Sequence, residues 1–259
     1  MDILAYILAG AGVGLAVGIT GVGGGSLMTP LLLLFGFPPH IAIGTDLMYA
    51  SLTKASGVAM HHRRGTIDWR LVLLLGLGSM PAALITVLIL YLYFPDSSSY
   101  GHILTSSLGV MLILTALVLL FKNKLVKFHK SAGDKPGFLH HHSTTLTWVM
   151  GVFLGTFVTL SSVGAGAFGT AVLMVLYPAL LSIRVVGTDL AHAVPLTLVA
   201  GLGHLLLGNV DFYLLGCLLM GSLPAIYLGT RLGSRLPDRV LHPILASTLL
   251  ALGLKYAFF

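Results

Sequence analysis

Gly44-Thr45-Asp46-Leu47 occurs twice in this chain, because the same four letters return as Gly187-Thr188-Asp189-Leu190. This shift of 143 residues aligns further identical positions, namely His61 with His204, Asp68 with Asp211, Gly78-Ser79 with Gly221-Ser222 and Pro81-Ala82 with Pro224-Ala225. Upstream, a shift of 141 residues aligns Gly14 with Gly155, Gly25 with Gly166 and Thr29 with Thr170. The chain is therefore predicted to be an internal duplication, and paired modules of this kind build one site between two halves in membrane transporters.

The composition places this duplicated chain in a membrane. Of its 259 residues, 56% are hydrophobic and 8% are charged, whereas about a quarter of the residues of a soluble domain are charged. Apolar runs such as 71–94 and 102–121 reach the roughly 20 residues that a spanning helix needs. These runs predict helices, because every backbone polar group has to be satisfied inside a bilayer. The net charge of +6 lies in short loops, which argues against a nucleic-acid partner.

The expected fold is an all-α polytopic membrane protein of two inverted repeats, with helices broken at glycines near the midplane. Residues 1–121 would form the first transmembrane repeat, 122–143 a basic cytoplasmic linker and 144–259 the second repeat. Five apolar segments are expected in each half, at 3–20, 27–36, 44–60, 71–94 and 102–121, and at 145–162, 168–181, 188–207, 213–230 and 243–259. Segments 27–36 and 168–181 are short, so the sequence allows either five full crossings per half or three crossings with a re-entrant hairpin.

The basic loops predict a multi-pass protein of the cytoplasmic membrane with one orientation. If the linker 122–143 lies inside and every segment crosses, the arginine-containing loops 61–70 and 231–239 also lie inside. The loops around Asp96 and Asp211, which contain no Lys or Arg, then lie outside, as the positive-inside rule requires. Matching loops of the two copies fall on opposite faces, which predicts that the repeat is inverted.

Two glycine clusters, at 20–26 (TGVGGGS) and 161–166 (SSVGAG), predict a binding site for a small anion. A helix broken at membrane depth exposes backbone N–H groups, and the N-terminus of the helix that follows favours an anion. Glycines permit close approach, and nearby hydroxyl groups add donors. The predicted substrate-binding residues of these clusters are Gly23, Gly24, Gly25, Ser26, Thr29, Ser161, Ser162, Gly164, Gly166 and Thr170. The alternative is helix packing, which we expect for Gly10, Gly14 and Gly18.

Three ionisable residues inside apolar segments are candidates for coupling transport to an ion. Asp46 and Asp189 are interpreted either as a proton or sodium site or, with Thr45 and Thr188, as part of helix N-caps. His192 follows Asp189 by three residues and is a candidate proton relay or a structural hydrogen-bonding residue.

Lys54 lies well inside segment 44–60, and its repeat equivalent is Thr197. A cation at this depth has to face a partner or a cavity. We therefore expect Lys54 to be a counter-charge for an anion, with snorkelling towards the cytoplasmic face as the alternative.

Residues 14–30, which read GLAVGITGVGGGSLMTP, and the AIGTDL block that follows them resemble the TauE/SafE family of membrane proteins, also described as the 4-toluene sulfonate uptake permease family. The duplicated blocks and the basic linker extend the resemblance to nearly the whole chain. It implies secondary transport of sulfite, sulfonates or related sulfur-containing anions across the cytoplasmic membrane. The family's glycine motif falls on Gly21, Gly23, Gly24, Gly25 and Pro30. The second copy departs from it at Ala165, Ala167 and Ala171, so the two clusters are not expected to be equal.

The leading functional prediction is a secondary anion transporter that works by alternating access, with H⁺ or Na⁺ as a coupling ion. A divalent-metal or Na⁺/H⁺ transporter is the alternative, based on the two aspartates and the histidines. No converging set of catalytic residues is apparent in the sequence, so we expect neither an enzyme nor a cofactor. No metal site is expected, because the histidine run at 140–142 lacks acidic or cysteine partners at ligand spacing.

Overall fold

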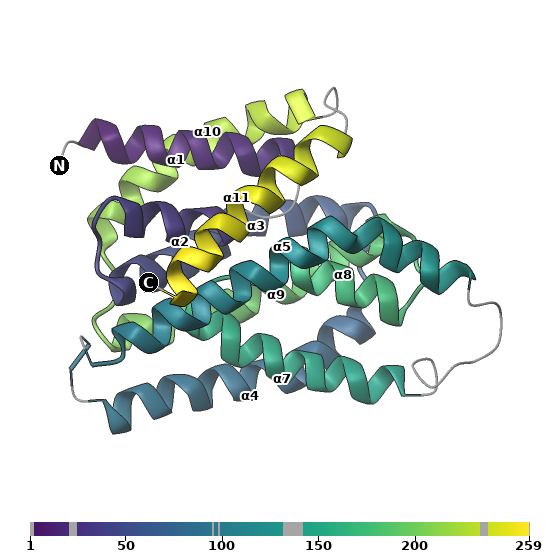
Figure 1. The fold of residues 1–259 in the computed structure, drawn as a ribbon, viewed down its shortest axis with the longest axis horizontal. Coiled ribbons are helices and arrows are strands. Elements are labelled where there is room, and N and C mark those ends of the chain that lie inside the picture. Colours follow the sequence, from purple (N-terminus) through teal and green to yellow (C-terminus); the bar gives the residue numbers. More distant parts are fainter. Residues whose placement is uncertain are drawn as a thin grey trace.

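The computed structural model describes the backbone of residues 3–20, 25–94, 96–97, 99–131, 142–233 and 238–258, and within these ranges all regular structure is α-helical. Side chains of residues 20, 25–26, 122–131, 232–233 and 238–245 are outside this description. The helices are α1 (Ile3–Thr20), α2 (Gly25–Leu34), α3 (Pro39–Arg63), α4 (Trp69–Tyr93), α5 (Gly101–Ser131), α7 (Ser143–Ser161), α8 (Ala167–Leu176), α9 (Ser182–Leu206), α10 (Phe212–Gly233) and α11 (Asp238–Phe258). They run side by side in one bundle (Figure 1), and the predicted all-α class is confirmed.

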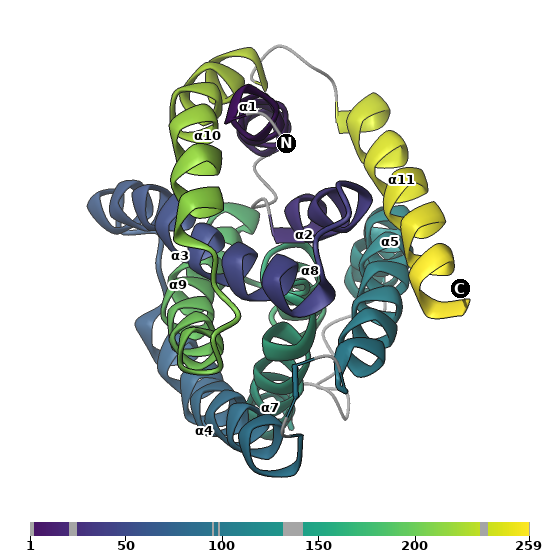
Figure 2. The ribbon, with the colours of Figure 1, turned by 90° about the vertical axis from the view of Figure 1, so that its left-hand side faces the viewer.

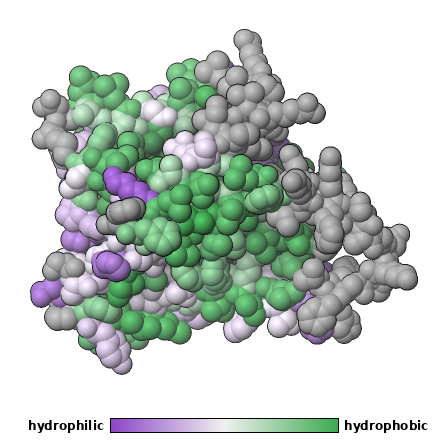
Figure 3. Space-filling view, in the orientation of Figure 1, coloured by the Kyte–Doolittle hydropathy of each residue, from purple (hydrophilic) through white to green (hydrophobic). Residues whose placement is uncertain are grey.

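Five of these helices contain a segment that is long and apolar enough to cross a membrane, namely α4, α5, α7, α9 and α10. Side chains such as Leu73, Leu77, Leu84 and Leu88 of α4 are more than half exposed, which suits contact with lipid rather than water. In Figure 3 an apolar surface covers the middle of the bundle, and hydrophilic residues gather towards its left edge. The chain is therefore a multi-pass membrane protein.

The two shortest helices settle the length of the doubtful segments. α2 and α8 contain 10 residues each, and a helix of that length is about 15 Å long, which is half the thickness of a hydrocarbon core. Neither helix can cross the bilayer alone. α8 ends shortly before Pro178, and α3 begins at Pro39, earlier than the expected position 44, because proline is favoured in the first turn of a helix. α5 continues to Ser131, so the first part of the predicted linker is helical.

The packing of the helices is compatible with two inverted repeats. α1 packs against α10, and its repeat equivalent α7 packs against α4, the equivalent of α10. The equivalents α5 and α11 are antiparallel, since Gly109 approaches Ala257 while Ile113 approaches Gly253. The end-on view in Figure 2 shows α1 beside α10 and α5 beside α11. The first helix of each half thus packs against a helix of the other half.

The basic ends of the helices gather at one end of the bundle. The end of α5, the start of α7 and the end of α10, which carries Arg231 in its last turn, all lie at the right of Figure 1. The end of α4 and the start of α5 lie at the left. This arrangement matches the single basic face on which the sequence-based topology depends.

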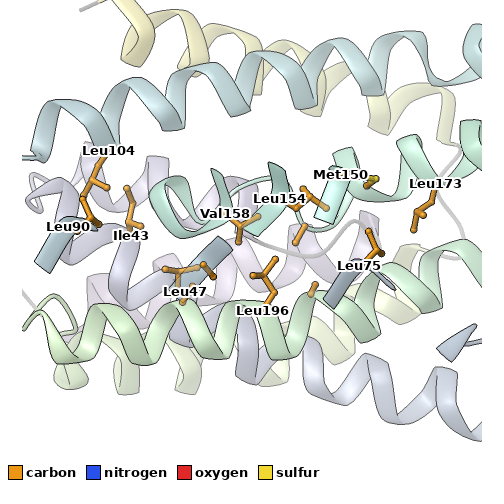
Figure 4. Packing of buried hydrophobic residues seen from close by; sticks show 14 of the residues in the cluster. Ile43, Leu47, Leu75, Leu90, Leu104, Met150, Leu154, Val158, Leu173 and Leu196 are labelled. Carbon is orange, nitrogen blue, oxygen red and sulfur yellow. The ribbon is translucent and has the colours of Figure 1, made fainter. Parts of the chain in front are cut away.

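The largest buried apolar cluster lies between α3, α4, α7 and α9, where these helices meet in the middle of the bundle. Leu47, Leu75, Leu154 and Leu196 are all fully buried in it, and Figure 4 shows their side chains pointing towards one another from facing helices. This cluster fixes α3 against α9, the two helices that carry the repeated aspartates.

Glycines let α1 and α7 approach their partner helices closely, as expected for Gly10, Gly14 and Gly18. A Cβ on Gly14 would lie 2.6 Å from the Ser222 carbonyl oxygen of α10, and one on Gly10 or Gly18 would also collide with α10 backbone. The repeat equivalent of Gly14, Gly155, meets the backbone of Ser79 in α4 in the same way. The packing prediction for these glycines is confirmed.

Gly14→Ala is therefore expected to destabilise the protein, whereas Gly12→Ala on the same helix is not. The added methyl group at Gly14 would overlap the α10 backbone, which cannot move aside as a side chain could, and overpacking of this kind costs about 1–3 kcal/mol. A Cβ on Gly12 meets no atom within 4 Å. Thermal unfolding of both variants in detergent would measure the difference. Equal stability of the two variants would contradict the close contact between α1 and α10.

Candidate functional site

Each short helix is bound to the long helix that follows it by one threonine and one buried aspartate. In the first half, Thr29 of α2 donates its hydroxyl and its backbone N–H to Oδ2 of Asp46, at 2.5 and 3.2 Å. In the second half, Thr170 of α8 donates its hydroxyl to Oδ2 of Asp189 at 2.9 Å. Both aspartates are buried, and Oδ1 of each has no hydrogen-bond partner. The sequence repeat therefore reproduces one hydrogen-bonded pair twice.

The interpretation of the two aspartates as part of helix caps is wrong. α3 begins at Pro39 and α9 at Ser182, so Asp46 and Asp189 lie about two turns inside their helices. Residues 39–43 and 182–186, which precede the two GTDL blocks, are helical as well and extend both helices towards their N-termini. The carboxylates instead approach the N-terminal turns of the neighbouring short helices.

The threonine of each GTDL block connects the two halves. The Thr45 hydroxyl accepts a hydrogen bond from the backbone N–H of Asp211 at 3.1 Å, and the Thr188 hydroxyl accepts one from that of Asp68 at 2.9 Å. A Cβ on Gly44 would collide with the backbone of the loop that carries Asp211. In this motif the glycine thus allows close backbone approach, the threonine contacts the other half of the protein and the aspartate contacts the short helix.

Lys54 reaches across from α3 to the second glycine cluster. Its side chain is 4% exposed, and its Nζ donates a hydrogen bond to the Ala165 carbonyl oxygen at 2.9 Å. The ammonium group also interacts electrostatically with Asp189 and Asp46. Its repeat equivalent, Thr197, only donates to carbonyl oxygens within its own helix. The side chain therefore points into the protein rather than towards the cytoplasmic face.

The second glycine cluster separates α7 from α8, and three of its residues have left-handed backbone conformations. Ser162 has φ 57°, Gly164 has φ 121° and Gly166 has φ 139°. The Ser162 hydroxyl is buried and interacts with the Asp46 carboxylate. The Ser161 hydroxyl is used locally, because it donates to Phe157 O at 2.6 Å and accepts from the Val163 N–H. Of these two predicted hydroxyl donors, Ser161 is committed to its own backbone neighbours, whereas Ser162 faces the Asp46 carboxylate.

His192 is held in the interior by a serine that sequence reasoning did not select. Nε2 of His192 lies 2.8 Å from the Ser79 hydroxyl of α4, and its Nδ1 is buried without a partner. The repeat equivalents of these residues are Ser222 and Tyr49, and the side chains of these two buried residues also interact with each other. The signal was present in the sequence, because Gly78-Ser79 recurs as Gly221-Ser222.

Five residues from α3, α9 and the second glycine cluster make up what we call the central polar cluster, namely Asp46, Lys54, Ser162, Asp189 and His192. All five side chains are buried, and Lys54 interacts electrostatically with Asp46, Asp189 and His192. A buried polar atom that lacks a hydrogen-bond partner costs about 1–3 kcal/mol. Retaining several such atoms in one place is typical of a site that binds a ligand or an ion.

The first glycine cluster is described only in part. Gly23, Gly24 and the side chain of Ser26 lie outside the described residues, although α2 begins at Gly25. Of the binding residues predicted for this cluster, Thr29 is therefore the one whose contacts are known. Among the described residues, no group of three His, Cys, Asp or Glu side chains is placed to hold a metal ion. His140 and His141 of the histidine run lie outside that part of the chain.

Comparisons with known proteins agree that this chain is a membrane protein. The family model described as "Sulfite exporter TauE/SafE" matches residues 6–256. The chain is 38% identical to the probable membrane transporter protein YjnA of Bacillus subtilis over 253 residues, which cover 97% of this chain and 98% of that protein. It is also 30% identical to the probable membrane transporter protein YdhB of the same organism, over 95% of this chain and 96% of YdhB.

A more distant relative extends the comparison to an archaeon. The chain is 25% identical to the probable membrane transporter protein MJ0441 of Methanocaldococcus jannaschii, over 96% of this chain and 92% of that protein. No solved structure matches the chain significantly. The family model matches nearly the whole chain, and two relatives align with it over nearly their full length. This chain therefore belongs to the TauE/SafE sulfite exporter family of membrane transporters.

Proposed function

We propose that this protein is a secondary transporter of small sulfur-containing anions, such as sulfite or a sulfonate, and that it works by alternating access across the cytoplasmic membrane. The observation that carries the proposal is the buried ammonium group of Lys54 at the start of the broken helix α8, where it donates to Ala165 O. A cation at this depth needs an anionic partner, and Asp46 and Asp189 supply that charge in the conformation seen here. The N-terminus of α8 adds positive potential at the same place.

The donor groups around Lys54 suit a small oxyanion. An ammonium group has three N–H donors, and Ala165 O accepts from it within the described residues. Nδ1 of His192 is buried nearby without a hydrogen-bond partner, and the Ser162 hydroxyl lies beside the Asp46 carboxylate. Together these groups could bind a tetrahedral or pyramidal anion through several hydrogen bonds, which is how oxyanions are held away from water.

Coupling to a cation is proposed for Asp46 and Asp189, with His192 as a further candidate. Both carboxylates keep one oxygen without a hydrogen-bond partner, so each can take up a proton or contact Na⁺. The same observation favours the second candidate function, a divalent-metal or Na⁺/H⁺ transporter. The two functions differ in the role of Lys54, since a site for cations gains nothing from a buried ammonium group.

A screen of ligand-induced stabilisation tests the proposal. Purified protein is heated in detergent with sulfite, sulfate, thiosulfate, methanesulfonate or divalent metal salts, and the melting temperature is recorded. A ligand at 100 times its Kd stabilises the folded state by about 2.7 kcal/mol, so a sulfur-containing anion is expected to raise the melting temperature. Stabilisation by Na⁺ or a divalent metal alone, with no response to any anion, would support the second candidate instead.

A further inference from the structure

We propose that the carboxylates of Asp46 and Asp189 occupy, in the conformation seen here, the places that the transported anion takes at the two short helices. Anion loading would then require a carboxyl group to take up a proton and withdraw from the helix N-terminus. This inference rests on the proposed anion transport and specifies how proton and anion share one site.

The second half gives the clearest view of a carboxylate in the place of a ligand. Asp189 accepts from the Thr170 hydroxyl at 2.9 Å, and the backbone amides of Gly166 and Thr170 also interact with its carboxylate. Its Oδ1 lies so close to α8 that a Cβ on Gly169 would collide with it. The N-terminal turn of a helix is a ready-made anion site, and here a side chain of the chain itself fills it.

The first half repeats this arrangement at α2. Oδ2 of Asp46 accepts both the backbone N–H and the hydroxyl of Thr29, so amide and hydroxyl donors again meet a carboxylate. In each half the second carboxylate oxygen, Oδ1, is buried and has no hydrogen-bond partner. The hydrogen-bond donors that could hold an anion are thus occupied by a carboxylate of the protein itself. One oxygen of that carboxylate has no hydrogen-bond partner, which is expected of a group that a substrate can replace.

The formal charges explain why a proton has to accompany the anion. With both carboxylates ionised and His192 neutral, the single ammonium group of Lys54 leaves the central polar cluster with a net charge of −1. A further anion entering this buried region would be repelled by the two carboxylates, because little water is present to screen the charges. If one aspartate takes up a proton and a monoanion replaces its carboxylate at the amides, the net charge of the cluster is unchanged.

Other titratable groups face the two carboxyls and have to be considered. Lys54 interacts with both, Tyr49 interacts with Asp46, and His192 interacts with Lys54. Lys54 and Tyr49 belong to α3 and His192 to α9, while α2 and α8 contribute Thr29 and Thr170. Of all these titratable groups, only the two aspartates contact the N-terminal turns of α2 and α8. Protonation of an aspartate is therefore the step that we couple to the entry of an anion at those turns.

The test is the pH dependence of anion binding by the full chain in detergent. Methanesulfonate is the probe, because a sulfonate remains a monoanion throughout the range from pH 5.5 to 8.5. For one proton taken up per anion bound, the affinity of the wild-type protein is expected to rise by up to about tenfold for each unit that the pH falls. A wild-type affinity that does not change with pH would overturn the inference while leaving anion binding, and so the proposed function, intact.

Asp189→Asn and Asp46→Asn remove the competing charge and keep the shape of the side chain. Each is expected to bind methanesulfonate at pH 8.5 more tightly than the wild type does and to flatten the pH dependence. The effect should be larger for Asp189→Asn, because Lys54 donates to the cluster that precedes α8. The matched control is Asp96→Asn in the exposed loop after α4, which should keep the wild-type profile.

The two kinds of failure can be told apart. Weaker binding by both asparagine variants at high pH, or an unchanged pH slope in both, would overturn the competition between carboxylate and anion. If an asparagine variant does not fold, the wild-type pH profile still decides. If methanesulfonate, sulfite and sulfate all fail to bind the wild type at every pH, the proposed function itself is rejected.

Discussion

Lys54→Met is expected to reduce anion flux by at least about a hundredfold, since a buried charge that stabilises an anion is worth several kcal/mol. The substitution keeps the length and much of the volume of the side chain but removes the cation that interacts with Asp46 and Asp189. It also removes the donor to Ala165 O. Uptake of labelled sulfite or methanesulfonate into proteoliposomes would measure the loss.

The matched control for this variant is Thr197→Ala, at the repeat-equivalent position in α9. Thr197 donates only to the carbonyl oxygens of Ala193 and Val194 in its own helix, so its loss should leave anion flux within about twofold of the wild type. Equal flux in the wild type and in Lys54→Met would show that the buried cation does not serve the anion. Size-exclusion chromatography would establish that each variant is folded before flux is compared.

Gly166→Ala is the second substitution with a large expected effect. Gly166 immediately precedes α8 with φ 139° and ψ −97°, and this region is essentially restricted to glycine. An alanine there would cost about 1–3 kcal/mol or force the break to rearrange, and rearrangement would move the amide groups away from Asp189. We expect a lower melting temperature and at least a tenfold loss of flux.

Ala165→Gly provides the control in the neighbouring residue. It places in the second cluster the residue that Gly24 supplies in the first, and it keeps the carbonyl oxygen to which Lys54 donates. Its flux should stay within about threefold of the wild type, because a glycine can adopt any backbone conformation that an alanine does. A wild-type melting temperature and flux in Gly166→Ala would contradict the role of this left-handed residue in shaping the site.

Much of the architecture could be predicted from the sequence because the duplication constrains it. Two sets of five segments, the glycine breaks and the approximate bounds of α1 and α4 follow from the apolar pattern. The N-termini of α3 and α9 were placed too late, because His40 and Arg184 interrupt the apolar residues that precede each GTDL block. The Pro38-Pro39 pair was a usable signal for α3, because proline is favoured in the first turn of a helix.

The site was predictable in its residues but not in its contacts. Asp46, Lys54 and Asp189 stand out because charges are rare in apolar segments. The hydrogen bond from Lys54 to Ala165 joins residues 111 apart, and that between Ser79 and His192 spans 113 residues. Contacts across such distances depend on how the helices pack, which no local pattern encodes. The repeat did contain a signal for one of the contacts. Thr29 and Asp46 recur together as Thr170 and Asp189, which suggests that each threonine contacts the aspartate that follows it.

Proteoliposomes with a proton gradient across the membrane provide the most direct test of the account. With wild-type protein, labelled sulfite or methanesulfonate should accumulate uphill and saturably when the gradient is imposed, and accumulation should stop when the gradient is dissipated or Lys54 is replaced by methionine. The account would be contradicted if no sulfur-containing anion moved in a protein-dependent way, or if the vesicles instead carried Na⁺ or a divalent metal with full activity in Lys54→Met.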